Sequence, residues 1–192
     1  MRAVSRGFSL IEMMAVVFLI SIAFSMSVFL FSDNDPERQL SKALERFTLL
    51  SQHASEMSGV NSEAYGLILI PPAWRDDPLT QGWLYRWQRL GRNGWEDVEE
   101  FGQEEFAPGV ELSISIEGQE WEYDDDKDEM PNPLVPIIGF FPGGDITPFE
   151  IEVGHQDFDM DPQHIEVSIW GEIVWRERQE AEEEAEEMME FN

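Results

Sequence analysis

The sequence predicts an α+β fold, in which a long N-terminal helix packs against antiparallel β-sheet. Residues 8–31 are predominantly apolar, and apolar residues then recur at helical spacing, about every 3.6 residues, as far as Gly59. From Tyr65 onward the helical period disappears, and short alternating segments separated by glycine and proline replace it. Helices grouped ahead of a run of short strands are typical of the α+β class.

Residues 8–31 have the length and composition of a transmembrane helix. About 20 apolar residues are enough to cross about 30 Å of hydrocarbon, and the only charge in this segment is Glu12. A carboxylate inside a membrane segment is costly, and it therefore marks a function rather than solvation. Arg2 and Arg6 precede the segment, and basic residues tend to stay on the cytoplasmic side. The remainder of the chain is expected on the opposite side of the membrane.

Residues 32–59 are expected to continue as an amphipathic helix. Pro36 follows a polar stretch and suits the first turn of a helix, where its missing N–H is not needed. The side chains of the apolar stripe are expected to pack on the sheet rather than to form a binding face. They are Leu40, Ala43, Leu44, Phe47, Leu50, Ala54 and Met57.

Residues 60–175 are expected to form a β-rich domain. Val110–Glu117 alternates apolar and polar residues, as a strand with one buried face does. Trp83, Tyr85 and Trp87 share one face of another segment, and they are expected in the core rather than in a sugar-binding site. The predicted strands are Tyr65–Ile70, Gly82–Leu90, Val110–Glu117, Ile137–Phe141, Phe149–Val153, His164–Trp170 and Glu172–Trp175.

The composition excludes several classes of function. Forty acidic residues against twelve basic ones give a formal charge of −28, whereas nucleic acid and anionic lipid are bound by Lys and Arg. A DNA-binding head is therefore not expected. The chain has no cysteine, which excludes disulfides, thiol chemistry and cysteine metal sites. The sequence contains no glycine-rich phosphate loop, nucleophile elbow or histidine–glutamate zinc helix, so no enzyme activity and no cofactor are expected.

Two acidic segments leave alternatives open. Asp124, Asp126 and Asp128 alternate as oxygen ligands of Ca²⁺ do, but the glycine and bidentate glutamate of an EF-hand are missing. A solvated loop is the favoured interpretation of residues 117–129. Residues 176–192 have a helix-forming composition, but glutamates at i and i+4 repel one another. A disordered or partly helical tail, able to contact a basic partner, is expected there.

The three histidines do not indicate a reactive centre. A metal cluster of His155, Asp157, Asp159 and His164 is an alternative to a polar surface loop, and the loop is the expected state. His53 lies apart from them, on the amphipathic helix. Because the histidines fall on separate predicted elements, no metal ligand and no catalytic residue is predicted.

The segment from Gly7 to Met14, Gly-Phe-Ser-Leu-Ile-Glu-Met-Met, resembles the class III prepilin signal of type IV pilins and type II secretion pseudopilins. The resemblance implies that a prepilin peptidase cleaves between Gly7 and Phe8 and methylates the new N-terminus of Phe8. Residues 1–7 are then the leader peptide, and the apolar segment stays attached. Glu12 is expected to pair with the N-terminal ammonium of a neighbouring subunit, because an unpaired carboxylate in hydrocarbon is penalised.

The soluble part is similar to the H-type minor pseudopilins of type II secretion, mainly through the segment from Ile138 to Phe149. In that family a Phe-x-Pro-x-Gly-x-(Ser/Thr)-Pro-Phe segment joins two late strands. The resemblance implies a proline–glycine turn, a threonine–proline pair that starts the next strand, and a phenylalanine anchor on each side. The residues concerned are Phe140, Pro142, Gly143, Gly144, Thr147, Pro148 and Phe149.

The resemblance implies a minor pseudopilin with a pilin-like fold. Such a protein is a structural component at or near the tip of the periplasmic pseudopilus, which helps to export folded proteins across the outer membrane. It implies a single-pass protein of the bacterial inner membrane, whose C-terminal domain is periplasmic. Two alternatives remain open, a minor pilin of a type IV pilus or DNA-uptake machine and, from another class, a membrane-tethered periplasmic hydrolase.

The implied partners are components of the same machine. They are the other minor pseudopilins of a tip complex, the major pseudopilin, the prepilin peptidase and the inner-membrane assembly platform. Secreted substrates and the outer-membrane secretin are further candidates. Nucleic acid is not an expected partner, because the soluble part is strongly acidic.

Overall fold

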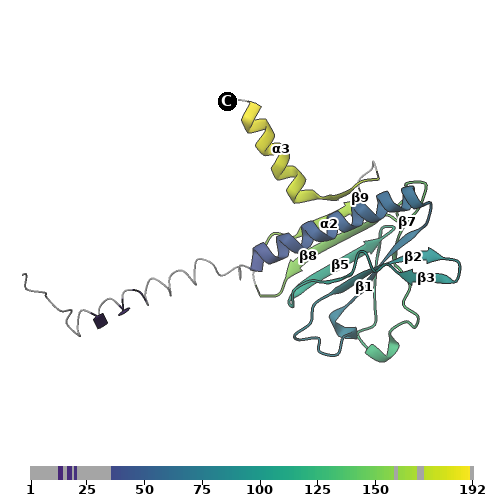
Figure 1. Ribbon diagram of the computed structural model, residues 1–192, viewed down its shortest axis with the longest axis horizontal. Coiled ribbons are helices and arrows are strands. Elements are labelled where there is room, and N and C mark those ends of the chain that lie inside the picture. Colours follow the sequence, from purple (N-terminus) through teal and green to yellow (C-terminus); the bar gives the residue numbers. More distant parts are fainter. Residues whose placement is uncertain are drawn as a thin grey trace, which may run out of the picture. The chain divides into compact units, whose positions relative to one another are not determined.

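The computed structural model describes residues 13–14, 17–18, 20, 36–157, 160–167 and 171–190 (Figure 1). The chain divides into two units, residues 1–39 and 40–192, and all the strands belong to the second.

Most of the predicted membrane segment lies outside the described residues, as do Gly7, Phe8 and Glu12. The few residues of the segment that are described are helical and exposed; they are Met13, Met14, Val17, Phe18 and Ile20. Within the described part of the chain, no helix is both long enough and apolar enough to span a membrane.

Helix α2 (Pro36–Asn61) carries the apolar stripe that the sequence predicts. Two serines on the same face are buried as well, and each has a hydrogen-bond partner. Ser51 Oγ donates to the carbonyl of Phe47 at 2.8 Å, and Ser58 Oγ donates to that of Phe140 at 3.1 Å. The buried residues of the helix are Leu40, Leu44, Phe47, Leu50, Ser51, Ala54 and Ser58.

Two antiparallel sheets follow α2. The first has the strand order β3-β2-β1-β7, and β4 also pairs with β2. Its strands are β1 (Tyr65–Ile70), β2 (Leu84–Gly91), β3 (Gly94–Asp97), β4 (Gln103–Glu105) and β7 (Ile138–Phe140). The second has the order β10-β9-β8-β5-β6. Its strands are β5 (Val110–Ile116), β6 (Gln119–Glu120), β8 (Phe149–His155), β9 (Gln163–Val167) and β10 (Ile173–Trp175).

Three helical elements accompany the sheets and α2 in the second unit. Two are single turns of 3₁₀ helix, η1 (Pro72–Trp74) and η2 (Lys127–Glu129). The third is helix α3 (Arg176–Glu190), which follows β10 directly.

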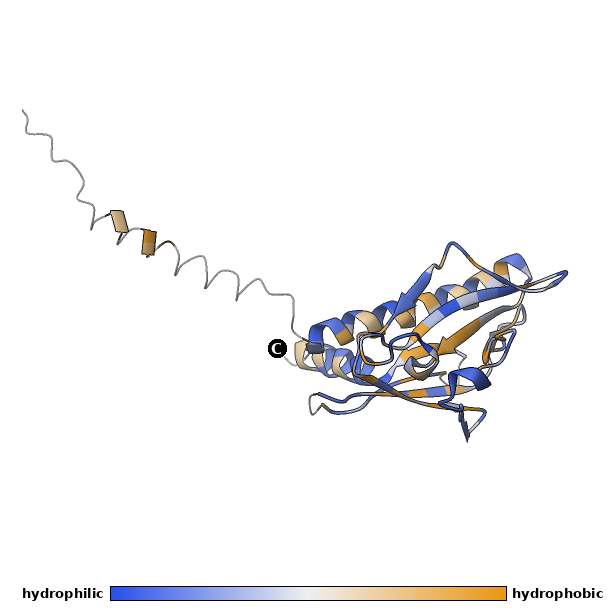
Figure 2. Ribbon diagram, turned by 90° about the horizontal axis from the view of Figure 1, so that it is seen from below, coloured by the Kyte–Doolittle hydropathy of each residue, from blue (hydrophilic) through white to orange (hydrophobic). Residues whose placement is uncertain are grey.

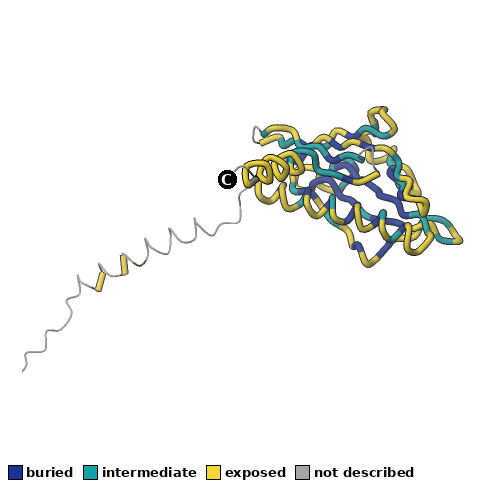
Figure 3. Tube along the Cα trace, turned by 90° about the horizontal axis from the view of Figure 1, so that it is seen from above, coloured by how far each residue is buried: buried dark blue, intermediate teal, exposed yellow. Residues whose placement is uncertain are grey.

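One apolar core joins α2 to both sheets. The Phe47 ring of α2 meets the Tyr85 ring of β2 edge-on, with centroids 5.1 Å apart. The core includes Val153 of β8 and Ile165 of β9 from the second sheet. Figure 1 shows α2 lying across the strands, Figure 2 shows the apolar residues concentrated in the sheets, and Figure 3 shows α3 exposed along its length. The α+β fold with a helix packed on antiparallel sheets is therefore confirmed.

The aromatic face predicted on one strand belongs to the core. Trp83, Tyr85 and Trp87 are all less than 5% exposed, and Trp87 packs against Phe140 with ring centroids 5.2 Å apart and the ring planes tilted by 50°. These rings bury a large apolar area and have no free face for a sugar. The prediction of packing residues rather than a sugar-binding site is confirmed for these three.

The structure differs from the sequence-based expectation mainly in short edge strands and in the tail. The sequence does not predict β4 or β6, and it predicts only a turn leading to Trp95 where β3 forms. Two- to four-residue strands contain too few alternating positions to be recognised locally. Residues 176–192 were expected to be disordered or partly helical, whereas residues 176–190 form helix α3.

Gly82 occupies a position where only glycine fits. A Cβ at this residue would lie 1.9 Å from the carbonyl oxygen of Phe106 and 2.8 Å from that of Ala107. The backbone is fixed there, because Phe106 N–H donates to the carbonyl of Trp83 at 2.9 Å and Gly82 N–H donates to Glu105 Oε1 at 2.9 Å. Gly82 therefore lets the chain lie close to the backbone that follows β4, just before the chain enters β2.

Gly82→Ala is expected to destabilise the protein by about 2–3 kcal/mol, because the added methyl group forces backbone atoms apart. Urea unfolding followed by tryptophan fluorescence measures the change. Gly59→Ala is the matched control, since nothing lies within 4 Å of its Cβ position in α2. It is expected to be neutral or to stabilise by up to about 1 kcal/mol. Equal effects of the two substitutions would contradict the steric argument.

Candidate functional site

The family-motif segment forms a tight connection after β7. Phe141 N–H donates to the carbonyl of Asp145 at 2.8 Å, and Gly144 N–H donates back to the carbonyl of Phe141 at 2.9 Å. Gly144 has φ +86°, a left-handed conformation that favours glycine. Pro142 and Gly143, both exposed, lie at the tip of this turn.

Thr147 and Gly139 join the two ends of the connection. Thr147 N–H donates to the carbonyl of Gly139 at 2.8 Å, and Gly139 N–H donates to Thr147 Oγ1 at 3.0 Å. The Thr147 side chain thus replaces a backbone carbonyl as the acceptor for the N–H of Gly139. Phe140 and Phe149 are both buried in the core, at 0% and 5% exposure. The segment is therefore a rigid structural link, and its motif residues have packing and turn-forming positions.

A second cluster fixes the beginning of α3 to the outer face of the second sheet. Glu150 of β8 lies directly opposite Glu166 of β9, and like charges in such cross-strand pairs repel. Arg176, the first residue of α3, lies between them. Its Nη2 is 3.1 Å from Glu150 Oε1 and also contacts Glu166 Oε2, while its Nε is 3.2 Å from Glu166 Oε1. One guanidinium group thus lies between two carboxylates and reduces their repulsion, and its contact with Glu166 is bidentate.

The next two residues of α3 make further contacts with the body of the domain. Glu177 accepts from the backbone N–H of His164 at 2.8 Å and lies 2.5 Å from its Nδ1. Partial burial alone would raise the pKa of Glu177, but the hydrogen bonds from His164 outweigh burial and lower it. Arg178 Nη1 is 3.0 Å from Glu45 of α2, and its guanidinium lies 5.9 Å from the centre of the Trp175 ring. These contacts explain why the tail is helical despite its repelling glutamates.

The sequence does contain a signal for these contacts. Arg176 and Arg178 are the only Lys or Arg residues after Lys127, and both stand at the start of the acidic tail. Two isolated cations after a long acidic stretch indicate ion pairs with that stretch. Their partners cannot be named from the sequence, because the pairing depends on the register of β8 with β9.

The acidic loop uses its carboxylates for turns. Asp124 Oδ1 accepts from the N–H of Asp126 at 2.9 Å, and Asp126 Oδ1 accepts from the N–H of Asp128 at 3.0 Å. Such bonds are typical of aspartates that shape a loop. Among the described residues, no group of three or more acidic or histidine side chains is placed to hold a metal ion.

The histidine positions are also separate from one another. His155 Nδ1 accepts from the N–H of Asp157 at 3.1 Å, whereas His164 contacts Glu177. Asp159 lies outside the described residues. His53 packs edge-on against Phe101, with ring centroids 5.2 Å apart.

Comparison with known proteins identifies the class to which this architecture belongs. Residues 2–28 match a family model described as the prokaryotic N-terminal methylation motif. The chain is 30% identical over 162 residues to the type II secretion system protein H of Pectobacterium carotovorum subsp. carotovorum, covering 77% of this chain and 80% of that protein. It is 25% identical over 163 residues to the Aeromonas hydrophila protein of the same name, covering 80% and 83% respectively.

The fold is similar to that of the minor pseudopilin EpsH from the type II secretion system of Vibrio cholerae. The TM-score is 0.56 at 14% identity, and the match covers 71% of this chain and 94% of EpsH. The fold and the N-terminal methylation motif together are those of a pilin-like protein. More specifically, the chain belongs to the type II secretion system protein H family.

Arg176→Met is expected to destabilise the domain by about 1–3 kcal/mol, because it leaves Glu150 and Glu166 facing each other without a cation. Urea unfolding at neutral pH measures this. Adding Glu166→Gln to Arg176→Met is expected to restore part of the loss. Arg92→Met removes the same charge from an exposed turn and is expected to change the stability by less than about 0.5 kcal/mol. A double variant no more stable than Arg176→Met would contradict the proposed compensation.

Proposed function

We propose that this chain is a structural subunit at or near the tip of the periplasmic pseudopilus, where it helps to export folded proteins across the outer membrane. The observation that carries the proposal is the pairing of an N-terminal methylation motif with a pseudopilin H domain in one chain. Its role is structural rather than catalytic. The domain offers a rigid connection after β7 and a helix, α2, packed along two sheets, and both are suited to a subunit of a filament.

We further propose that the chain is processed as a prepilin. In this proposal residues 1–7 are the leader, a prepilin peptidase cleaves between Gly7 and Phe8, and the amine of Phe8 is methylated. Support comes from the match of residues 2–28 to the methylation motif and from the glycine–aromatic pair at its start. Residues 8–31 then remain as the membrane segment, with the C-terminal domain in the periplasm.

Glu12 is proposed to set the register between subunits. In hydrocarbon a single carboxylate is penalised unless a cation compensates it, and the new N-terminal ammonium of the neighbouring subunit supplies one. The proposed partners are therefore the other minor pseudopilins and the major pseudopilin, together with the inner-membrane assembly platform that recruits them. The excess of acidic over basic residues supports a protein-binding rather than a DNA-binding role.

Mass spectrometry of the protein extracted from its native membrane is expected to show loss of residues 1–7 and one methyl group on Phe8. Gly7→Leu is expected to abolish both changes, because a bulky side chain crowds the cleavage site. Gly59→Ala, a glycine substitution in open space far from the leader, is expected to be processed normally. A mature wild-type protein that still begins at Met1 would refute the processing proposal.

Glu12→Val is expected to leave membrane insertion intact but to reduce recovery of the protein in sheared pseudopili by at least about tenfold. Removing one partner of a buried ion pair costs about 3–5 kcal/mol, which is enough for this loss. Immunoblotting of membrane and filament fractions measures it. Glu12→Asp keeps the charge and is expected to retain part of the incorporation. Normal incorporation of Glu12→Val would contradict the pairing.

A further inference from the structure

A groove lies between α2 and the beginning of α3, with β10 as its floor. Its α2 wall includes Leu49, which is 56% exposed although it is a large apolar side chain. The polar neighbours on this wall already have partners within the chain. Thr48 Oγ1 donates to the carbonyl of Leu44 at 2.9 Å, and Gln52 Nε2 donates to that of Ile173 at 2.9 Å. This wall therefore presents an uncovered apolar side chain rather than unpaired polar groups.

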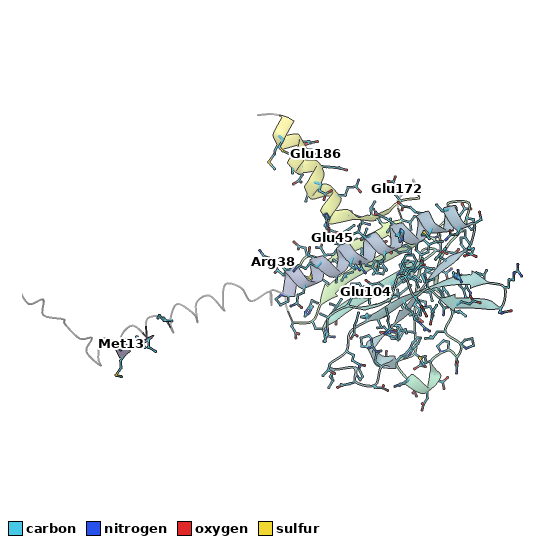
Figure 4. The ribbon with its side chains drawn as sticks, in the orientation of Figure 1. Met13, Arg38, Glu45, Glu104, Glu172 and Glu186 are labelled. Atoms are coloured by element: carbon cyan, nitrogen blue, oxygen red, sulfur yellow. The ribbon has the colours of Figure 1, made fainter. Side chains whose placement is uncertain are left out.

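The opposite wall of the groove is acidic. Helix α3 contains two arginines and eight glutamates, a net charge of −6, and Glu182 lines the groove. Figure 4 labels Glu45 on α2 and Glu186 farther along α3. Arg176, Glu177 and Arg178 attach the first turn of α3 to the domain. The acidic helix α3 therefore has a defined position beside Leu49 of α2.

The groove already binds one cation of its own chain. The guanidinium of Arg178 lies over the Trp175 ring and contacts Glu45 at 3.0 Å and Glu182 at 2.9 Å. An aromatic face flanked by two carboxylates is a favourable environment for a cation. The single positive charge of Arg178, however, balances only one of these two negative charges. The glutamates farther along α3 are exposed.

The charges decide which kind of partner fits. A second copy of this chain is disfavoured, because each copy carries a formal charge of −28. Nucleic acid is disfavoured for the same reason. The exposed Leu49 and the floor residues Val174 and Trp175 lie beside the acidic helix α3. This arrangement matches a helix that is apolar on one side and basic on the other, bound as helices bind in grooves.

We infer that this groove binds a cationic amphipathic helix of a partner protein. Apolar side chains of that helix cover Leu49 and Trp175, and its Lys or Arg side chains lie along the acidic face of α3. The residues that line this groove all belong to the second unit, so substitutions of them leave Gly7 and Glu12 unchanged and test its binding separately from leader processing.

The test uses the processed full-length protein in nanodiscs of neutral phosphatidylcholine, so that a basic probe is not attracted to the lipid. The probe is a synthetic peptide of about 18 residues, about five helical turns, with leucines on one face and lysines on the other. A shuffled peptide of the same composition controls for charge, and empty nanodiscs control for the lipid. Isothermal titration at about 150 mM salt, where surface attraction is screened beyond about 8 Å, gives the Kd.

Matched variants distinguish the groove from general attraction. Leu49→Gln is expected to weaken binding of the amphipathic peptide by about tenfold or more, as loss of one buried leucine contact implies. Leu79→Gln, at a residue that is 90% exposed outside the groove, is expected to change the Kd by less than about twofold. Glu182→Gln is expected to weaken binding about threefold, and Glu187→Gln on the same helix by less than about twofold.

Equal effects at Leu49 and Leu79, or equal affinity for the two peptides, would overturn the inference, because binding would then be charge attraction alone. A crosslinking measurement gives an independent check, since the chain has no cysteine. Leu49→Cys is expected to form a disulfide with a cysteine on the leucine face of the peptide, and Leu79→Cys is not. Crosslinking at both positions, or at neither, would also overturn it.

Discussion

The apolar face of α2 is the feature on which the two sheets depend, because its side chains enter a core shared by both. Phe47 packs on Tyr85 of the first sheet, and Gln52 donates a hydrogen bond to β10 of the second. Neither sheet has another helix over the same core in the described part of the chain. In a pseudopilin this arrangement has a consequence for assembly, since the helix that organises the soluble domain directly follows the segment proposed to stack with other subunits.

The acidic side chains of this protein lie in several distinct local environments rather than being spread evenly over the chain. On the outer face of the second sheet, opposed glutamates are compensated by Arg176 at the start of α3. In the loop before β7, aspartates accept backbone N–H groups and so shape the turns. A further group of acidic residues lies on α3, where eight glutamates fall within fifteen residues and most of them are exposed. Acidic residues therefore have three roles here: two bind Arg176 across neighbouring strands, others shape a loop, and those of α3 form an exposed surface.

The family-motif segment and the tail have different positions in the domain. The segment from Ile138 to Phe149 is a link in which Thr147 and Gly139 bond each other and both flanking phenylalanines are buried. This link holds the end of β7 next to the start of β8. The tail forms a surface beside α2, and Glu177 and Arg178 of its first turn attach it to the domain. A subunit with an exposed acidic helix outside its core is able to make a contact through that helix without altering the core.

The sequence by itself determined the α+β class, the stripe of α2, the longer strands and the family, because hydrophobic periodicity and motif spacing are local properties of the chain. It also supplied Gly7, Phe8 and Glu12, which stay predictions since they lie outside the described residues. Only the tertiary structure decided that the tail is helical. Local repulsion between its glutamates argues against a helix, and the compensating contacts join Arg176 to Glu150 and Arg178 to Glu45, residues far apart along the chain. Such pairs depend on strand register and on packing against α2, and no local pattern encodes either.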